Sequence, residues 1–122
     1  MKNKKTLVVG ATEKTDRYAN IAIQRLLQAG HPVYAFGNRE GEAHGVSIKT
    51  VFPDTSESID TVTLYLSEKY QKEYYQKIID LKPKRVIFNP GTENREFEQL
   101  LASSNIEAEV ACTLVLLSMN AY

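Results

Sequence analysis

Short, continuously apolar runs that alternate with amphipathic stretches constrain the fold of this chain more than any other feature. The first run, Thr6 to Gly10, carries Leu-Val-Val and ends in glycine. A run without polar alternation is typical of a strand that is buried on both faces, as in a parallel sheet. From Tyr18 to Ala29 the apolar residues are spaced to form one stripe along a helix. Gly30 and Pro32 end that helix, and a second strand is predicted at 32–36.

The same alternation continues along the rest of the chain. Further strands are predicted at 61–66, 85–89 and 107–113, and further helices at 70–81, 93–103 and 114–119. The polar stretch from Gly37 to Gly45 contains three glycines and is predicted to be a loop. This order predicts an α/β fold, a doubly wound parallel sheet of about five strands with helices on both faces. The 122 residues, 1–122, are expected to form a single domain.

Composition excludes several classes of protein. Fifteen Lys and Arg residues balance fifteen Asp and Glu residues, so we expect no binding to nucleic acid through an overall positive charge. The single cysteine, Cys112, cannot form an internal disulfide, and no residues have the spacing of a zinc site. The apolar run after the basic start is too short for a signal peptide or a membrane span. The protein is therefore expected to be soluble and cytoplasmic, with no membrane contact.

The connection from the first strand to the first helix, Gly10 to Arg17, is a candidate ligand site. Ligands of doubly wound sheets bind outside the carboxyl ends of the strands. The N–H groups and the positive dipole end at the start of the helix favour an anion, and the Arg17 guanidinium suits phosphate. Neither the G-x-G-x-x-G nor the Walker spacing is present. In the alternative interpretation, Gly10 only makes a turn and Arg17 is a solvated charge.

A basic residue follows the second strand, in the sequence Phe36-Gly37-Asn38-Arg39. An NAD enzyme usually has an acid here for the ribose 2′-hydroxyl. Arg39 therefore disfavours NAD and favours a ligand with an extra phosphate on its ribose. NADP, with a 2′-phosphate, and coenzyme A, with a 3′-phosphate, both fit. Alternatively, Arg39 is a solvated loop charge.

No residue pattern indicates a catalyst. His31 lies at the amino end of its strand and is expected to be structural. His44 lies nearer the ligand edge but has no evident partner, and Cys112 is expected to behave as a buried small apolar residue. Tyr70 and Tyr74 fall on one face of the predicted helix 70–81, where packing is the simpler role and stacking on a base the alternative.

Segments along nearly the whole chain, in their order and spacing, resemble one family. They are Val8 to Thr12, Arg17-Tyr18, Gly30 to Tyr34, Gly41 to Gly45, Asp60 to Val62, Val86 to Asn94 and Cys112 to Leu114. Through them the chain resembles the CoA-binding domain proteins. These are small Rossmann-like domains related to the CoA-binding domain of the succinyl-CoA synthetase α subunit.

The resemblance implies a nucleotide site formed by three connections. The residues expected at the pyrophosphate are Gly10, Ala11, Thr12 and Arg17. Those expected at the adenosine ribose and its phosphate are Gly37, Asn38 and Arg39. The mouth where the pantetheine arm leaves is expected at Asn89, Pro90 and Gly91.

The leading hypothesis is stand-alone binding of coenzyme A or an acyl-CoA without catalysis by the chain itself. The related synthetases owe their chemistry to further domains, which this sequence lacks. The alternative is an NADP-binding oxidoreductase subunit or redox sensor, completed by a partner. A phospho-acceptor domain is excluded, because the first strand ends in Val9-Gly10-Ala11 rather than in acids. A homo-oligomer and a partner enzyme both remain open.

Overall fold

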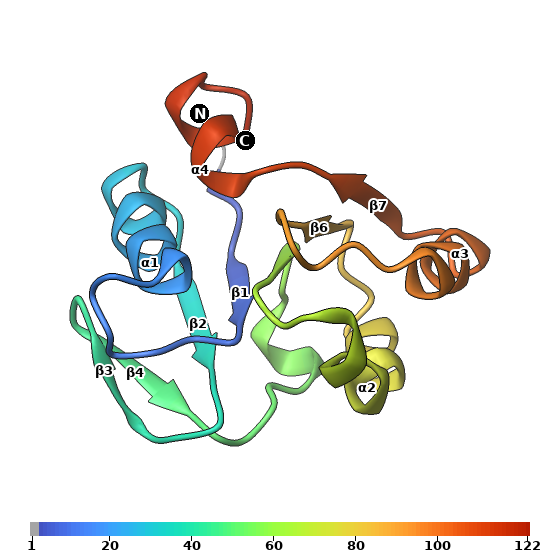
Figure 1. Cartoon of the computed structure of the whole chain (residues 1–122), viewed down its shortest axis with the longest axis horizontal. Helices are drawn as coiled ribbons and strands as arrows, with labels where there is room; N and C mark the ends of the chain where they lie inside the picture. The colour runs from blue at the N-terminus through green and yellow to red at the C-terminus, as the bar shows by residue number, and fades with distance from the viewer. Residues whose placement is uncertain (1–2) are drawn as a thin grey trace.

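In the computed structural model, which describes residues 3–122, seven strands form one sheet in the order β3-β4-β2-β1-β5-β6-β7 (Figure 1). The strands are β1 (Thr6–Val9), β2 (Val33–Phe36), β3 (Gly41–Ala43), β4 (Val46–Lys49), β5 (Thr61–Leu64), β6 (Arg85–Phe88) and β7 (Glu107–Val110). All neighbouring strands pair in parallel except β3 and β4. The predicted α/β fold with a mostly parallel sheet is confirmed.

Helices cover both faces of this sheet. They are α1 (Tyr18–Gln28), α2 (Tyr75–Asp80), α3 (Arg95–Ser103) and α4 (Thr113–Ser118), with 3₁₀ turns at Thr55–Glu57, Glu68–Tyr70 and Lys72–Tyr74. In β1, Val8 packs in the core beside α1, whereas Leu7 and Val9 pack in the core with α2 and α3. Alternate side chains of a strand point to opposite faces, so the apolar run of β1 fills both cores. None of the helices in residues 3–122 is both long and apolar enough to span a membrane.

The predicted loop at 37–45 is wrong in part, because β3 lies within it and pairs with β4. The two strands are joined by His44 and Gly45, whose φ angles are 53° and 86°. Two consecutive residues with positive φ make the two-residue turn that suits the right-handed twist of a hairpin. The short hairpin adds two strands to the five that were predicted, at the edge beyond β2.

Two predicted helices begin later than expected. In the segment 70–81, two 3₁₀ turns precede α2, because the Gln71 side chain turns inward and donates to the carbonyl oxygens of Leu66 and Thr92 at 2.9 and 2.8 Å. Tyr70 and Tyr74 consequently do not share a helical face. At 93–103, α3 begins after Asn94, whose side chain caps the helix by accepting from the Phe97 N–H at 3.1 Å.

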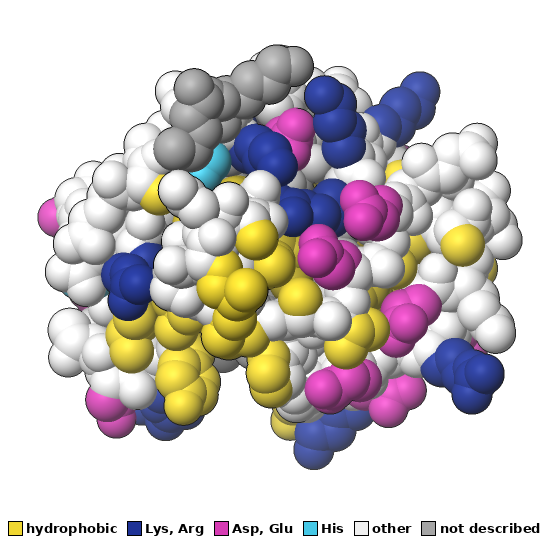
Figure 2. All heavy atoms as spheres, turned by 90° about the horizontal axis from the view of Figure 1, so that it is seen from above, with side chains coloured by type: hydrophobic (Ala, Val, Ile, Leu, Met, Phe, Trp, Pro, Cys, Tyr) yellow, Lys and Arg dark blue, Asp and Glu magenta, His cyan; other side chains and the backbone are white. Residues whose placement is uncertain are grey.

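The helix α4 presents an apolar surface. The four residues from Leu114 to Leu117 are all apolar, and Val115 and Met119, the residue just after the helix, are 50% and 68% exposed. Figure 2 views the molecule from the side on which α4 lies and shows hydrophobic side chains gathered in the middle of that face. Acidic and basic side chains border them.

Tyr122 ties the C-terminal segment to the amino end of the sheet. Its ring centroid lies 4.5 Å from the guanidinium carbon of Arg85 and 4.9 Å from the ring of His31. Its hydroxyl hydrogen-bonds with Thr6 Oγ1 at 2.6 Å, and its carbonyl oxygen accepts from Lys4 Nζ at 2.6 Å. Burial raises the pKa of the Tyr122 phenol. Aromatic packing, cation–π contact and hydrogen bonding therefore act on the same side chain.

We expect Tyr122→Ala to lower the free energy of unfolding by about 3 kcal/mol, because it removes an aromatic ring packed among cations. Urea denaturation measures the change. Tyr70→Ala is the matched control, since that side chain is 55% exposed, and it should cost about 0.5 kcal/mol. Equal losses for the two variants would show that Tyr122 contributes nothing beyond an exposed tyrosine.

Candidate functional site

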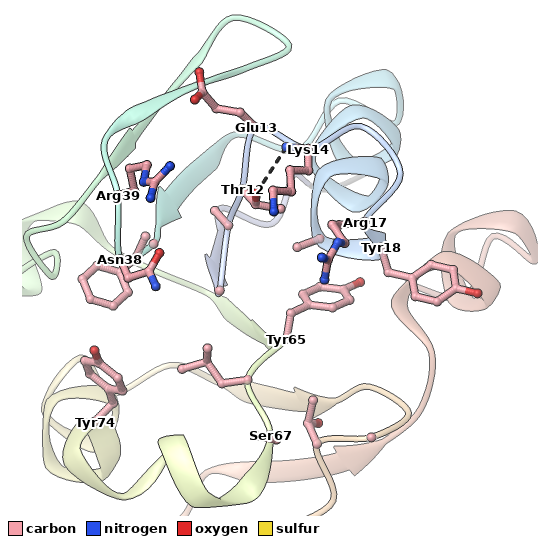
Figure 3. A pocket seen from close by; sticks show the side chains of 18 of the residues that line it. Thr12, Glu13, Lys14, Arg17, Tyr18, Asn38, Arg39, Tyr65, Ser67 and Tyr74 are labelled. Carbon is pink, nitrogen blue, oxygen red and sulfur yellow. Dashed lines mark hydrogen bonds between the residues drawn. The ribbon is translucent and has the colours of Figure 1, made fainter.

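A pocket of about 740 Å³ opens at the carboxyl ends of β1, β2, β5 and β6 (Figure 3). From β1 the chain first builds β2 and β4 on one side and then β5 on the other, so β1 marks the switch point of the sheet. The lining residues are Gly10, Ala11, Thr12, Glu13, Lys14, Arg17, Tyr18, Ala19, Phe36, Gly37, Asn38, Arg39, Tyr65, Leu66, Ser67, Tyr74, Pro90, Gly91 and Thr92.

Nine of the ten residues proposed from the sequence line this pocket. They are Gly10, Ala11, Thr12, Arg17, Gly37, Asn38, Arg39, Pro90 and Gly91. The tenth, Asn89, is 2% exposed and lies behind the wall. Its amide nitrogen donates to Thr63 Oγ1 at 2.7 Å and to the Leu64 carbonyl at 2.9 Å, and its oxygen accepts from the Thr113 N–H at 2.8 Å. Asn89 thus joins β5, β6 and α4, and its amide hydrogens are already in use.

The first loop is held against the end of β2 by backbone contacts. The N–H groups of Gly10 and Ala11 both donate to the Phe36 carbonyl oxygen at 2.9 Å. A Cβ on Gly37 would collide with the Ala11 carbonyl, so only glycine permits this approach. The donors that remain for a ligand therefore come from later in the loop and from the start of α1.

The N-terminus of α1 is open toward the pocket. Its N-cap residue, Arg17, makes no side-chain capping bond, and the first turn contains no acid. Among residues 3–122, no hydrogen-bond partner is found for the N–H groups of Tyr18 and Ala19. Unpaired donors at the positive end of a helix dipole favour an anion.

Three basic side chains and one acid are the charged groups of the lining. Arg39 lies on the opposite side of the pocket from Arg17 (Figure 3). Lys14 belongs to the loop between β1 and α1, and in this view it lies between the two arginines. The Arg17 side chain is 61% exposed, and its Nε lies 3.9 Å from the Asp16 carboxylate, a loose contact. The acid, Glu13, turns toward the hairpin, where its carboxylate accepts from the Glu42 N–H at 3.2 Å. The pocket is therefore locally positive although the chain has no net charge.

Aromatic side chains form much of the remaining wall. Tyr74 lies below Asn38 in Figure 3, and its ring packs edge-on against Phe36 with centroids 5.3 Å apart. Phe52 stacks on Tyr74 at 5.9 Å from outside the lining. Tyr65 lies below Arg17 in Figure 3. Burial raises the pKa of its phenol to about 12, and this value includes a smaller, opposite effect of hydrogen bonds with Thr63 and Thr113.

Two buried amides near the pocket were missed from the sequence. Asn20 is 2% exposed and donates to the Thr12 carbonyl at 2.9 Å, and Gln71 is 1% exposed and joins the loops after β5 and β6. Asn20 lies three residues before Ile23 on the apolar side of α1. A polar residue on the apolar side of a predicted helix could have indicated a buried hydrogen-bonding role. Gln71 gave no comparable signal, because it lies outside a regular helix.

The histidines and the cysteine do not line the pocket. His31 has the structural role expected, since its Nδ1 accepts from the Lys4 N–H at 3.0 Å. The pKa of His31 is lowered, mainly because the ring is buried and also because of the positive charges of Lys4 and Arg85. His44 hydrogen-bonds with Asn20, and Cys112 is half-buried rather than fully buried. Within residues 3–122, no group of three His, Cys, Asp or Glu side chains is placed to hold a metal ion.

Comparison with known proteins identifies the family. The family model described as a CoA binding domain matches residues 4–118, so the chain belongs to the CoA-binding domain family. No significant match was found among curated proteins.

Solved structures share the fold. The crystal structure of an uncharacterized protein is 45% identical over the full length of both chains, with a TM-score of 0.93. A hypothetical protein from Pyrococcus horikoshii OT3 is 30% identical over 93% of this chain and 80% of its own, with a TM-score of 0.82. A Thermus thermophilus protein, 22% identical over 98% of this chain and 91% of its own, has a TM-score of 0.84 and shows the fold alone.

The raised pKa of Tyr65 predicts a loss of stability at high pH. The unfolded phenol ionises near 10 and the folded one near 12. Between these values the folded state holds the proton more tightly, so the free energy of unfolding falls as pH rises. In urea denaturation from pH 8 to 11.5, Tyr65→Phe should show a shallower fall than the wild type. A slope identical to that of the wild type would contradict the assignment to Tyr65.

Proposed function

We propose that this member of the CoA-binding domain family binds coenzyme A or an acyl-CoA in the pocket at the switch point, and that it does not catalyse a reaction by itself. One observation carries the proposal. In a CoA-binding domain, the pocket combines three basic side chains with an uncapped helix N-terminus. Coenzyme A carries a pyrophosphate and a separate ribose 3′-phosphate, so a ligand of this class needs positive groups at two places.

The pyrophosphate is assigned to the first loop and the start of α1. There Thr12, Lys14 and Arg17 line the pocket next to the unpaired N–H groups of the helix. Gly10 and Ala11 shape the approach but give their N–H groups to Phe36. Helix N–H groups supply direction and the basic side chains supply charge, the combination that phosphate groups favour.

The adenosine end is assigned to the other side of the pocket. In this proposal Arg39 would meet the 3′-phosphate, and Gly37 and Asn38 would lie beside the ribose; all three residues line the pocket. Tyr74 and Phe36 offer an apolar wall of the kind against which a base packs. The pantetheine arm would then leave past Pro90 and Gly91, with Asn89 bracing the strand ends behind them.

The nature of the lining supports a binding role. In the described part of the chain, neither histidine nor cysteine lines the pocket, and the single acid is turned toward β3. The phenol of Tyr65 is protonated at neutral pH, as an ordinary tyrosine is, and burial raises its pKa further, to about 12. Pairing with a second copy or with an enzyme remains a prediction, as does a cytoplasmic location.

In a thermal-shift comparison, coenzyme A should stabilise the protein more than NAD does, because Arg39 stands where NAD favours an acid. A ligand at a hundredfold excess over its Kd adds about 2.7 kcal/mol. Acetyl-CoA, NADP and NAD complete the series. A larger shift with NADP than with coenzyme A would favour the oxidoreductase alternative, and equal shifts for NAD and coenzyme A would exclude the proposal.

The two phosphate sites can be separated by calorimetric titration with coenzyme A and with dephospho-CoA, which lacks the 3′-phosphate. Arg39→Ala should weaken only coenzyme A, whereas Arg17→Ala should weaken both ligands. Because both side chains are exposed to solvent, each loss should be about tenfold, near the lower end of charge-assisted contacts, and smaller at high salt. Arg95→Ala is the matched control, since Arg95 is exposed and lies outside the pocket lining.

Each outcome of this titration has a defined meaning. An equal effect of Arg39→Ala on the two ligands would show that the adenosine end is misplaced. A loss with Arg95→Ala as large as with Arg17→Ala would show that only overall charge matters.

A further inference from the structure

The side chain of Asn20 links the first loop to the hairpin across α1. Asn20 is 2% exposed, and its amide nitrogen donates to the Thr12 carbonyl at 2.9 Å. Its oxygen lies 2.8 Å from His44 Nε2. Because the Asn20 nitrogen faces a carbonyl, its oxygen is the acceptor in the second bond and His44 is the donor. The Thr12 carbonyl and His44 together therefore fix which way the buried amide points.

The bond to Thr12 determines the direction of the next N–H group. The peptide between Thr12 and Glu13 is trans, so its carbonyl and its N–H point in opposite directions. With the carbonyl directed at buried Asn20, the Glu13 N–H points away from α1. Glu13 lines the pocket, and within residues 3–122 its N–H has no hydrogen-bond partner.

Rotation of the same peptide would remove this donor from the site. The Thr12 carbonyl would then turn toward the pocket, where its partial negative charge would repel an anion. The Glu13 carboxylate is kept out of the way by a different bond, to the Glu42 N–H of β3 at 3.2 Å. The first loop is thus connected twice with the hairpin that sequence analysis did not predict: through Asn20 to His44, and directly from Glu13 to Glu42.

We propose that Asn20 is a positioning residue of the anion site: its amide, oriented by His44, holds the Thr12–Glu13 peptide so that the Glu13 N–H donates to a diphosphate. The inference rests on the proposed function and identifies the backbone donor that would recognise the pyrophosphate. Asn20 itself does not touch the ligand.

Amide spectra of ¹⁵N-labelled protein test the proposal, with titrations of coenzyme A and, separately, of inorganic pyrophosphate. The Glu13 amide proton should move downfield with either ligand in the wild type. In Asn20→Leu, which has a similar size and no hydrogen bonds, that shift should be absent and coenzyme A should bind about tenfold more weakly. His44→Ala changes an exposed side chain and should weaken binding about threefold.

Thr6→Val is the control for a loss of stability alone. Thr6 is fully buried and hydrogen-bonded, but it lies at the amino end of β1, away from the pocket. This variant should bind coenzyme A as the wild type does and keep the Glu13 shift.

The outcomes separate the two proposals. A Glu13 shift with pyrophosphate but no binding of coenzyme A would sustain the role of Asn20 and refute the proposed ligand. No Glu13 shift in the wild type with either ligand, or an unchanged shift in Asn20→Leu, would overturn the role of Asn20. If Asn20→Leu does not fold, His44→Ala decides, and wild-type binding with the full Glu13 shift in that variant would overturn the proposal.

Discussion

The carbonyl oxygen of Phe36, which accepts two N–H groups from the first loop at 2.9 Å, is the contact on which the candidate site depends. Val9 and Phe36 are partners in the parallel pair β1–β2, so the two strands end at the same level. The loop after β1 is thereby drawn over the end of β2, and Gly37 leaves room for it. Beyond that contact the backbone turns into α1, with donors that remain unpaired at the edge of the sheet.

Buried side-chain amides hold the other loops of the pocket. Gln71 bridges the loops after β5 and β6, Asn89 joins both strands to α4, and Asn20 supports the first loop. Every fully buried side-chain nitrogen and oxygen in the described residues has a partner. Satisfied polar groups in a low-dielectric interior stabilise one arrangement strongly, because any alternative would leave a donor or acceptor unpaired. The loops are thus organised before a ligand arrives.

Local charge, rather than total charge, sets the character of the site. The chain as a whole is neutral, yet among residues 3–122 the lining holds Lys14, Arg17 and Arg39 with only Glu13 as an acid. The hairpin draws the Glu13 carboxylate toward β3, which increases the positive character of the pocket. Charges separated by more than a Debye length are screened in salt, so the groups within the pocket matter most to a ligand.

The fold class followed from the spacing of apolar residues, because buried strands and amphipathic helices leave different periodicities in a sequence. Nine of the ten proposed site residues line the pocket for a related reason: strand ends meet at one edge of a parallel sheet. Asn89 was the exception, since position along the chain does not reveal which way a side chain turns. The hairpin was missed because its signal is a two-residue turn with positive φ at His44, a residue that adopts this conformation less often than glycine.

The sequence by itself determined five of the seven strands and their alternation with helices, the position of the first loop and the basic residues that border it. These features are local, and the periodicity of apolar residues, the positions of glycines and the residue types predict them. Tertiary structure alone decided that Tyr74 would join the wall near Asn38, that Glu13 would turn to the hairpin and that Asn20 would support Thr12. Each of these contacts joins elements that only the packing of the sheet brings together, so no local pattern could have specified it.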